Sequence, residues 1–133
     1  MKNHDVLRHI LKHCNKIQNV VSFFGNEYDS FCSNEIYQDA VSFSLAQIGE
    51  LTTHLSADFK AETSDKINWR SVKALRNIVV HNYDSINFSV LWNIMKNDIP
   101  DMMAFCSDYV QDHEFLGQRA VEPEIDDDEE WEP

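Results

Sequence analysis

The stretch 3–24 repeats apolar side chains at the spacing of an α-helix, and this repeat constrains the fold more than any other feature. Every third or fourth position belongs to the set Val6, Ile10, Cys14, Ile17, Val21 and Phe24. Such a stripe lies on one face of a helix and has to be buried against another element. With Asn3 as a candidate N-cap and Gly25 as a candidate stop, the pattern predicts a helix over residues 3–24.

The chain is poor in the residues on which tight turns depend. Its 133 residues include three Gly and three Pro, too few for the many turns of a β-sandwich or barrel. A hydrophobic content of 43% is enough for one packed core. We therefore expect one all-α domain over residues 1–115, an up-down bundle of four to five helices. An acidic tail over residues 116–133 is predicted to be disordered.

Two further helices are predicted in the middle of the chain. One covers about residues 35–55 after the candidate cap Asn34, with one stripe formed by Tyr37, Val41, Ser44, Ile48, Leu51 and Leu55. Ser44 and Gly49 predict a close contact with a neighbouring helix, since small residues let backbones approach. The other covers about residues 69–82 after the candidate cap Asn68, with a buried stripe formed by Val72, Leu75 and Val79.

The last helical part begins after the candidate cap Asn87, with an apolar face formed by Val90, Leu91, Ile94 and Met95. At Asp98 and Pro100 we expect either an interruption, with Asp98 as a cap, or a kinked continuation. The stretches 26–33 and 56–68 are polar and are predicted to be connections.

Cysteine and histidine usage suggests neither disulfides nor a metal site. Three widely spaced cysteines without a CxxC pair are typical of a reducing compartment. His9 and His13 lie four residues apart, but no third ligand is near, and we expect them on a solvated face. The absence of a long apolar run adds the expectation of a cytoplasmic protein without a membrane segment.

The motif Arg76–Tyr83 combines an arginine, a histidine and a tyrosine within eight residues of an otherwise apolar helical pattern. Arginine is a permanent cation suited to phosphate oxygens, and histidine can transfer protons near neutral pH. Together they are typical of phosphodiester chemistry. In a straight helix, however, Arg76 and His81 diverge by about 140° and rise by about 7.5 Å. Either the helix unwinds near His81, or a second copy of the chain completes the site across a two-fold axis, which we favour.

Charge is distributed unevenly along the chain. The net charge is −12, and residues 122–133 hold eight of the 23 acidic groups and no base. The remainder is only mildly acidic, and Lys66, Arg70, Lys73 and Arg76 lie close together before and within the motif. Arg70 and Lys73 are therefore candidate RNA-binding residues. The tail, in turn, can be interpreted as a competitor for RNA or as a solubilising segment.

With these residues the chain resembles the HepT-like branch of the HEPN superfamily, over about residues 4–112. The resemblance is carried by the segments 47–50 (Gln-Ile-Gly-Glu), 68–70 (Asn-Trp-Arg), 75–83 and 97–100 (Asn-Asp-Ile-Pro), together with Trp92. Members of that branch are small all-α ribonuclease toxins of type II toxin-antitoxin modules, each paired with a minimal nucleotidyltransferase antitoxin.

The resemblance implies a homodimeric, metal-independent endoribonuclease that needs no cofactor and cuts mRNA or tRNA. Arg76 and His81 would be the catalytic pair and Asn77 a polar orienting neighbour. Tyr83 would match the tyrosine that the antitoxin adenylylates. Asn82 stands where family members commonly have Asp, and the acidic tail has no expected counterpart.

Two other interpretations stay open from the sequence. In the first, Arg76 and His81 only fix a helix end, with Arg76 bonded to an acid such as Glu50 and His81 to a carbonyl. In the second, the chain is a catalytically silent HEPN bundle that serves as a binding module for a nucleotidyltransferase.

Overall fold

The computed structural model describes residues 2–81 and 87–120, with the backbone alone for 78–81 and 114–120. It contains helices and no strand in these ranges, which confirms the all-α prediction. The elements in chain order are α1 Asn3–Phe24, α2 Tyr28–Cys32, α3 Glu35–Leu51, η1 Thr52–His54, α4 Ala57–Glu62, α5 Trp69–His81, α6 Phe88–Asn93, η3 Ile94–Asp98 and α7 Ile99–Ala120.

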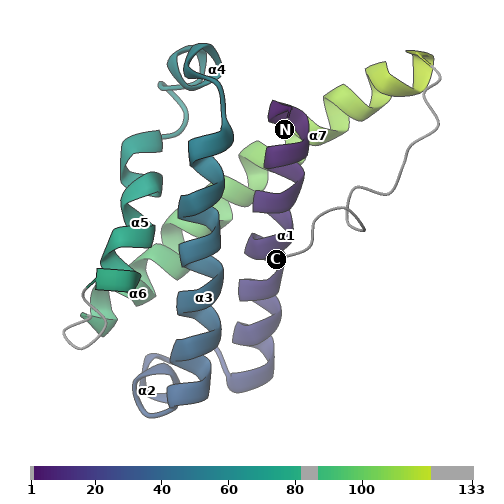
Figure 1. Ribbon diagram of the computed structural model, residues 1–133. Coiled ribbons are helices and arrows are strands. Elements are labelled where there is room, and N and C mark those ends of the chain that lie inside the picture. Colours follow the sequence, from purple (N-terminus) through teal and green to yellow (C-terminus); the bar gives the residue numbers. More distant parts are fainter. Residues whose placement is uncertain (1, 82–86, 121–133) are drawn as a thin grey trace.

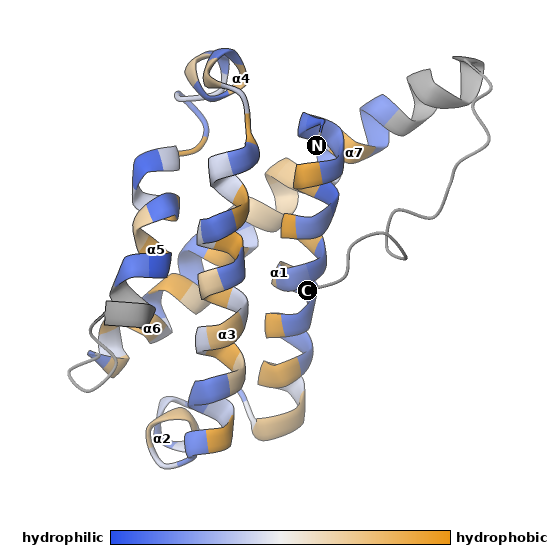
Figure 2. Ribbon diagram, viewed as in Figure 1, coloured by the Kyte–Doolittle hydropathy of each residue, from blue (hydrophilic) through white to orange (hydrophobic). Residues whose placement is uncertain are grey.

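The long helices α1, α3, α5 and α7 form the bundle and alternate in direction, as the up-down prediction requires (Figure 1). Helix α3 is central, because it packs against α1 on one side and against α5 on the other. Helix α7 crosses behind and packs on α1. In Figure 2, α1 is hydrophobic along the side toward α3 and hydrophilic along the opposite side, which is the amphipathic pattern of its sequence.

The core contains the stripes predicted for the first two helices. Fully buried side chains include Val6, Ile10, Cys14, Ile17, Tyr37, Val41, Leu45 and Ile48. The Tyr37 hydroxyl donates to the Gly25 carbonyl at 3.1 Å, and Gly25 ends α1 with a φ of 111°. A glycine is favoured there because this φ lies in the left-handed region.

Among the caps predicted for α1, α3 and α6, two are confirmed and one is wrong. The Asn34 side chain accepts from the Tyr37 amide, and the Asn87 side chain accepts from the Ser89 and Val90 amides. At the start of α1, however, Lys2 is the N-cap residue. Asn3 lies inside the helix, and its Oδ1 accepts from the Ser56 amide at 3.0 Å, which ties α1 to the start of α4.

The helix predicted over 35–55 is shorter than expected. Helix α3 ends at Leu51 and tightens into the 3₁₀ turn η1. The hydroxyls of Thr52 and Thr53 donate to the Gly49 and Glu50 carbonyls, each at 2.7 Å, and so bind carbonyl groups in the last turn of the helix. The connections 26–33 and 56–68 each contain a short helix, α2 and α4.

Of the two alternatives at Asp98, an interruption or a kinked continuation, the structure has a continuous helical path. The π-helical turn η3 joins α6 to α7, and Pro100 lies in the first turn of α7, where its missing N–H is tolerated. Asp98 is therefore not a cap. Val90, expected on the apolar face, is 44% exposed.

The histidines of α1 also differ from the prediction. His9 and His13 are 4% and 6% exposed instead of solvated. The His13 ring lies against α3, 6.3 Å from the ring of Phe43, centroid to centroid. Residues 116–120, assigned to the tail from the sequence, are the last residues of α7, and the rest of the tail lies outside the described residues.

Candidate functional site

The start of α5, the helix that carries the motif, is fixed by side chains of its own first turn. Asn68 Oδ1 accepts from the Ser71 amide at 3.1 Å, as the capping prediction requires. The buried Trp69 donates from Nε1 to Thr63 Oγ1 at 2.8 Å and packs against Phe59 of α4 and Phe105 of α7. The first turn therefore has a defined place relative to α4 and α7.

Further along, α5 packs against α3 at Gly49, where the two backbones approach each other closely. A Cβ atom added at Gly49 would lie 2.8 Å from the Arg76 amide nitrogen, 3.1 Å from Arg76 Cβ and 3.2 Å from the Val72 carbonyl oxygen. This confirms the predicted close helix contact. The motif arginine thus sits at the point where the two helices are nearest.

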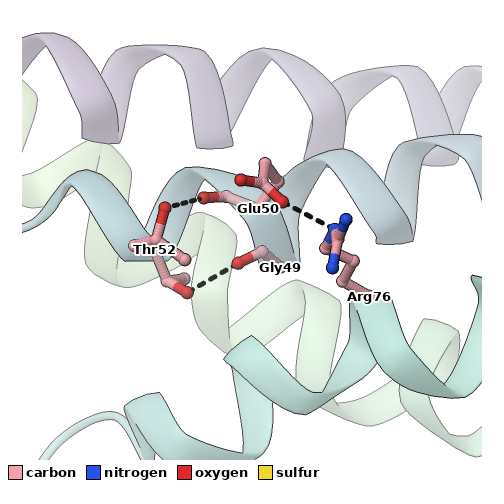
Figure 3. Close-up of polar contacts among 5 residues, drawn as sticks. Gly49, Glu50, Thr52 and Arg76 are labelled. Carbon is pink, nitrogen blue, oxygen red and sulfur yellow. Dashed lines mark hydrogen bonds and ion pairs between the residues drawn. The ribbon is translucent and has the colours of Figure 1, made fainter.

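Glu50, the residue after that glycine, binds the motif arginine. Arg76 Nε lies 2.6 Å from Glu50 Oε1, and each side chain keeps 48% of its surface exposed. Figure 3 shows the arginine reaching from α5 to the carboxylate at the end of α3. The guanidinium is therefore held by an ion pair and is still open to solvent.

The structure describes some of the other motif residues in full and others only in part. Helix α5 continues through His81, so Arg76 and His81 belong to one helix, and helix geometry separates their positions by about 140° around its axis. The alternative in which the helix unwinds near His81 also concerns residues 82–86, which lie outside the described residues. Asn77 is exposed next to Arg76. The side chain of His81 and the whole of Tyr83 and Asn82 lie outside the described residues.

The predicted RNA-binding bases are on the outer surface of the same helix. Arg70 and Lys73 are exposed, about two turns and one turn before Arg76, respectively. Lys66, just before the helix, is exposed as well. Together with Arg76 they give α5 a cationic surface in a chain that is acidic as a whole, and such a surface attracts phosphates.

A cavity of about 430 Å³ borders α5 without involving Arg76. It lies between α3, the start of α5 and the η3–α7 path. Its lining combines apolar side chains with polar and charged ones, and includes Ile48, Val72, Leu75, Met102, Lys66, Asp98 and Asp101. The cavity shares Lys66 with the cationic surface, but Arg70, Lys73 and Arg76 do not line it.

The described residues lack the features of two other classes of site. No cluster of three or more His, Cys, Asp or Glu side chains in this part of the chain is arranged to hold a metal ion. Within the same residues, no helix has both the length and the apolar character needed to cross a bilayer.

Comparison with known proteins identifies relatives described as ribonucleases. A candidate RNase of Methanocaldococcus jannaschii, MJ1380, is 35% identical over 74 residues, which cover 56% of this chain and 67% of that protein. A second from the same organism, MJ0127, is 26% identical over 91% of this chain and 100% of its own length. A probable ribonuclease HepT of Thermococcus cleftensis is 32% identical over 56% of this chain and 67% of its own.

No solved structure shows significant similarity to the chain. The family model described as "Ribonuclease HepT-like" matches residues 10–109, from the first turns of α1 into α7, and this range includes the whole motif. The chain belongs to the ribonuclease HepT-like family.

Proposed function

We propose that this protein is an endoribonuclease whose catalytic groups are Arg76 and His81. The observation that carries the proposal is the family match across the motif, supported by a guanidinium that is held in place and half-exposed. Relatives described as RNases support the same activity.

In this mechanism the RNA supplies its own nucleophile, so no metal is required. The 2′-hydroxyl attacks the adjacent phosphorus, the 2′-O–P bond forms and the P–O5′ bond breaks. His81 moves the protons, from the attacking hydroxyl and to the leaving oxygen. Arg76 stabilises the charge on the non-bridging phosphate oxygens. The products are a 2′,3′-cyclic phosphate and a 5′-hydroxyl.

A homodimer with two motifs in one cleft solves the geometry of the site. In one copy, Arg76 and His81 occupy positions about 140° apart around the axis of a helix that continues through His81. Across a two-fold axis, Arg76 of one copy and His81 of the other can approach one phosphate. Asn77 orients the bound phosphate, while Arg70 and Lys73 bind the flanking backbone.

The biological role that we propose is that of a toxin in a type II toxin-antitoxin module. Its partner would be a minimal nucleotidyltransferase that adenylylates Tyr83. An attached AMP would bring negative charge and bulk next to the motif and block the path of the RNA.

The nuclease proposal is tested by RNA cleavage in EDTA, with the end groups of the products determined. Wild type should cleave, while Arg76→Ala and His81→Ala should each lower kcat by at least about 100-fold. His54→Ala, at an exposed histidine of η1, is the matched control and should be as active as wild type. Equal activity of all four proteins, or loss of wild-type activity in EDTA, would disprove the mechanism.

The antitoxin proposal has a separate test. After co-expression with a minimal nucleotidyltransferase of the kind proposed as its partner, mass spectrometry should find AMP on the peptide that contains Tyr83. If Tyr83→Phe is neutralised as well as wild type, the partner acts by occlusion and covalent control is wrong.

One observation favours a second candidate function, a silent binding module. The bond between Arg76 and Glu50 is also what a purely structural arginine would make. In that case the purified chain would not cleave RNA, and it would bind the nucleotidyltransferase equally well with Arg76→Ala and His81→Ala.

A further inference from the structure

Glu50 occupies a position that helix stability does not explain. It lies in the last turn of α3, whose end at Leu51 carries the negative pole of the helix dipole. A carboxylate is unfavourable there, and a cation is favourable. The ion pair with Arg76 supplies that cation, so the placement of Glu50 becomes understandable through the arginine of the motif.

The backbone around this pair is fixed from two sides. Gly49 brings the α3 backbone against the Arg76 amide and leaves no room for a Cβ atom. The Thr53 hydroxyl donates to the Glu50 carbonyl at 2.7 Å, which holds the end of α3. The backbones that carry Glu50 and Arg76 are therefore held close together, and the ion pair joins the two side chains.

The bond itself leaves the arginine able to bind an anion. Its closest approach is made by Nε, whereas the paired Nη nitrogens provide four of the five donors of a guanidinium. A fork of this kind matches two oxygens of one phosphate. A group held by a second partner before substrate arrives avoids part of the entropy of ordering it in the transition state.

We propose that Glu50 is a positioning residue of the ribonuclease reaction. Through Nε it holds the Arg76 guanidinium in the orientation in which the Nη donors face the scissile phosphate. It touches neither the RNA nor the reacting atoms. This inference rests on the proposed ribonuclease function and adds to it a role for an acid that would otherwise repel the substrate.

The proposal predicts a split between kcat and KM. Glu50→Gln keeps the size of the side chain and removes a negative charge beside the phosphate. The RNA should then bind as well or better, with KM unchanged or lower, while kcat falls about 10-fold or more because the guanidinium is less well oriented. Glu50→Asp keeps the charge but is one methylene shorter, and it should lower kcat with little change in KM. Glu35→Gln, at the opposite end of α3, is the matched control and should leave kcat unchanged.

A second readout does not depend on activity. In ¹⁵N-arginine-labelled protein, the Nε–H signal of Arg76, identified by its loss in Arg76→Lys, should exchange slowly with water in wild type. It should exchange faster in Glu50→Gln and stay slow in Glu35→Gln. Thermal unfolding of each variant shows whether a loss of kcat merely follows a loss of fold.

The outcomes separate the two proposals. If Arg76→Ala abolishes cleavage while Glu50→Gln leaves kcat unchanged or raises it, the positioning role is wrong and the ribonuclease function stands. A rise in KM at constant kcat, or a kcat loss that tracks the unfolding temperature, overturns the positioning role too. If wild type does not cleave RNA but its Arg76 Nε–H is protected by Glu50, the ribonuclease function has failed and the pair is structural.

Discussion

Gly49 has no side chain, and this lets the backbone of α3 pack directly against the backbone of α5 at Arg76. In a helix interior, replacing glycine by alanine ordinarily stabilises a protein by about 0.5–1 kcal/mol. Here the added Cβ would meet backbone atoms of α5, at 2.8 Å from the Arg76 amide nitrogen. Backbone cannot rotate away as a side-chain end can, so α3 and α5 would have to separate.

We therefore predict that Gly49→Ala has the opposite sign to the ordinary effect. Overpacking of this kind costs about 1–3 kcal/mol, which outweighs the gain in helix propensity. Urea denaturation should show a lower free energy of unfolding, and Gly49→Ser should lower it further. The displaced Arg76 should also reduce kcat. A stabilised Gly49→Ala protein would show that the two helices slide apart at little cost.

His13 carries a pH dependence of stability. Burial, with Lys16, Lys12 and His9 adding repulsion, lowers its pKa from 6.5 to about 4, and its Nδ1 is buried without a hydrogen-bond partner. Between about pH 6.5 and pH 4 the unfolded chain binds a proton at His13 that the folded protein does not. The free energy of unfolding should therefore fall as the pH falls through this window.

The expected loss at His13 is about 2–3 kcal/mol between pH 6.5 and 4.5. In His13→Gln the side chain cannot take up a proton, so denaturant titrations at a series of pH values should give a flatter profile. His54→Gln, at an exposed histidine, should keep the wild-type slope. Parallel profiles for wild type and His13→Gln would contradict the assignment.

At the scale of the helix, α5 depends on its first turn for a correct start. Asn68→Ala removes the acceptor for the Ser71 amide and should cost about 1 kcal/mol of stability. Asn87→Ala removes an equivalent cap from α6 and is the matched control. Because Asn68 caps the helix that bears the motif, its loss should lower kcat more than the loss of Asn87 at equal destabilisation. Equal kcat values would mean that the Gly49 contact alone aligns α5.

Periodicity predicted the long helices and could not predict the short ones. The stripes of α1, α3 and α5 extend over several turns, and their residues identify a face without any tertiary information. Helices α2 and α4 have five and six residues, too few for a period to be recognised. The path from α6 through η3 to α7 depends on a π turn, for which sequence offers no reliable pattern.

The candidate site also contains residues that the sequence predicts and residues that it does not. The motif is contiguous, so the sequence alone identifies Arg76, His81 and the basic residues before them. Its partner Glu50 comes from another helix, and the sequence could name it only as one possible acid. Which acid is reached depends on how α3 crosses α5, and that crossing is set by Gly49. The burial of His9 and His13 depends likewise on which side of α1 is covered by neighbouring helices.

For the molecule as a whole, one face of α3 is notable because it exposes large apolar side chains to solvent. Ile36 and Phe43 are 69% and 58% exposed, and they lie seven residues apart, so they share one stripe of the helix. Seven residues further along the same stripe lies Glu50, which holds Arg76. An apolar surface that leads to the motif arginine is the surface that a two-fold contact would need in order to bring two motifs together.

We predict that Phe43→Glu and Ile36→Glu convert the proposed dimer to monomers and reduce RNA cleavage in parallel. Each introduces a charge whose desolvation the contact would have to overcome. Val90→Glu, at another exposed apolar residue on α6, is the control and should leave both properties unchanged. Sedimentation of wild type should give about twice 15.5 kDa.

Mixing Arg76→Ala with His81→Ala protomers should then restore part of the activity, because one of the two sites in each mixed dimer would keep both groups. A monomeric wild type that cleaves RNA, or a Phe43→Glu dimer of unchanged stability, would rule out this face as the interface.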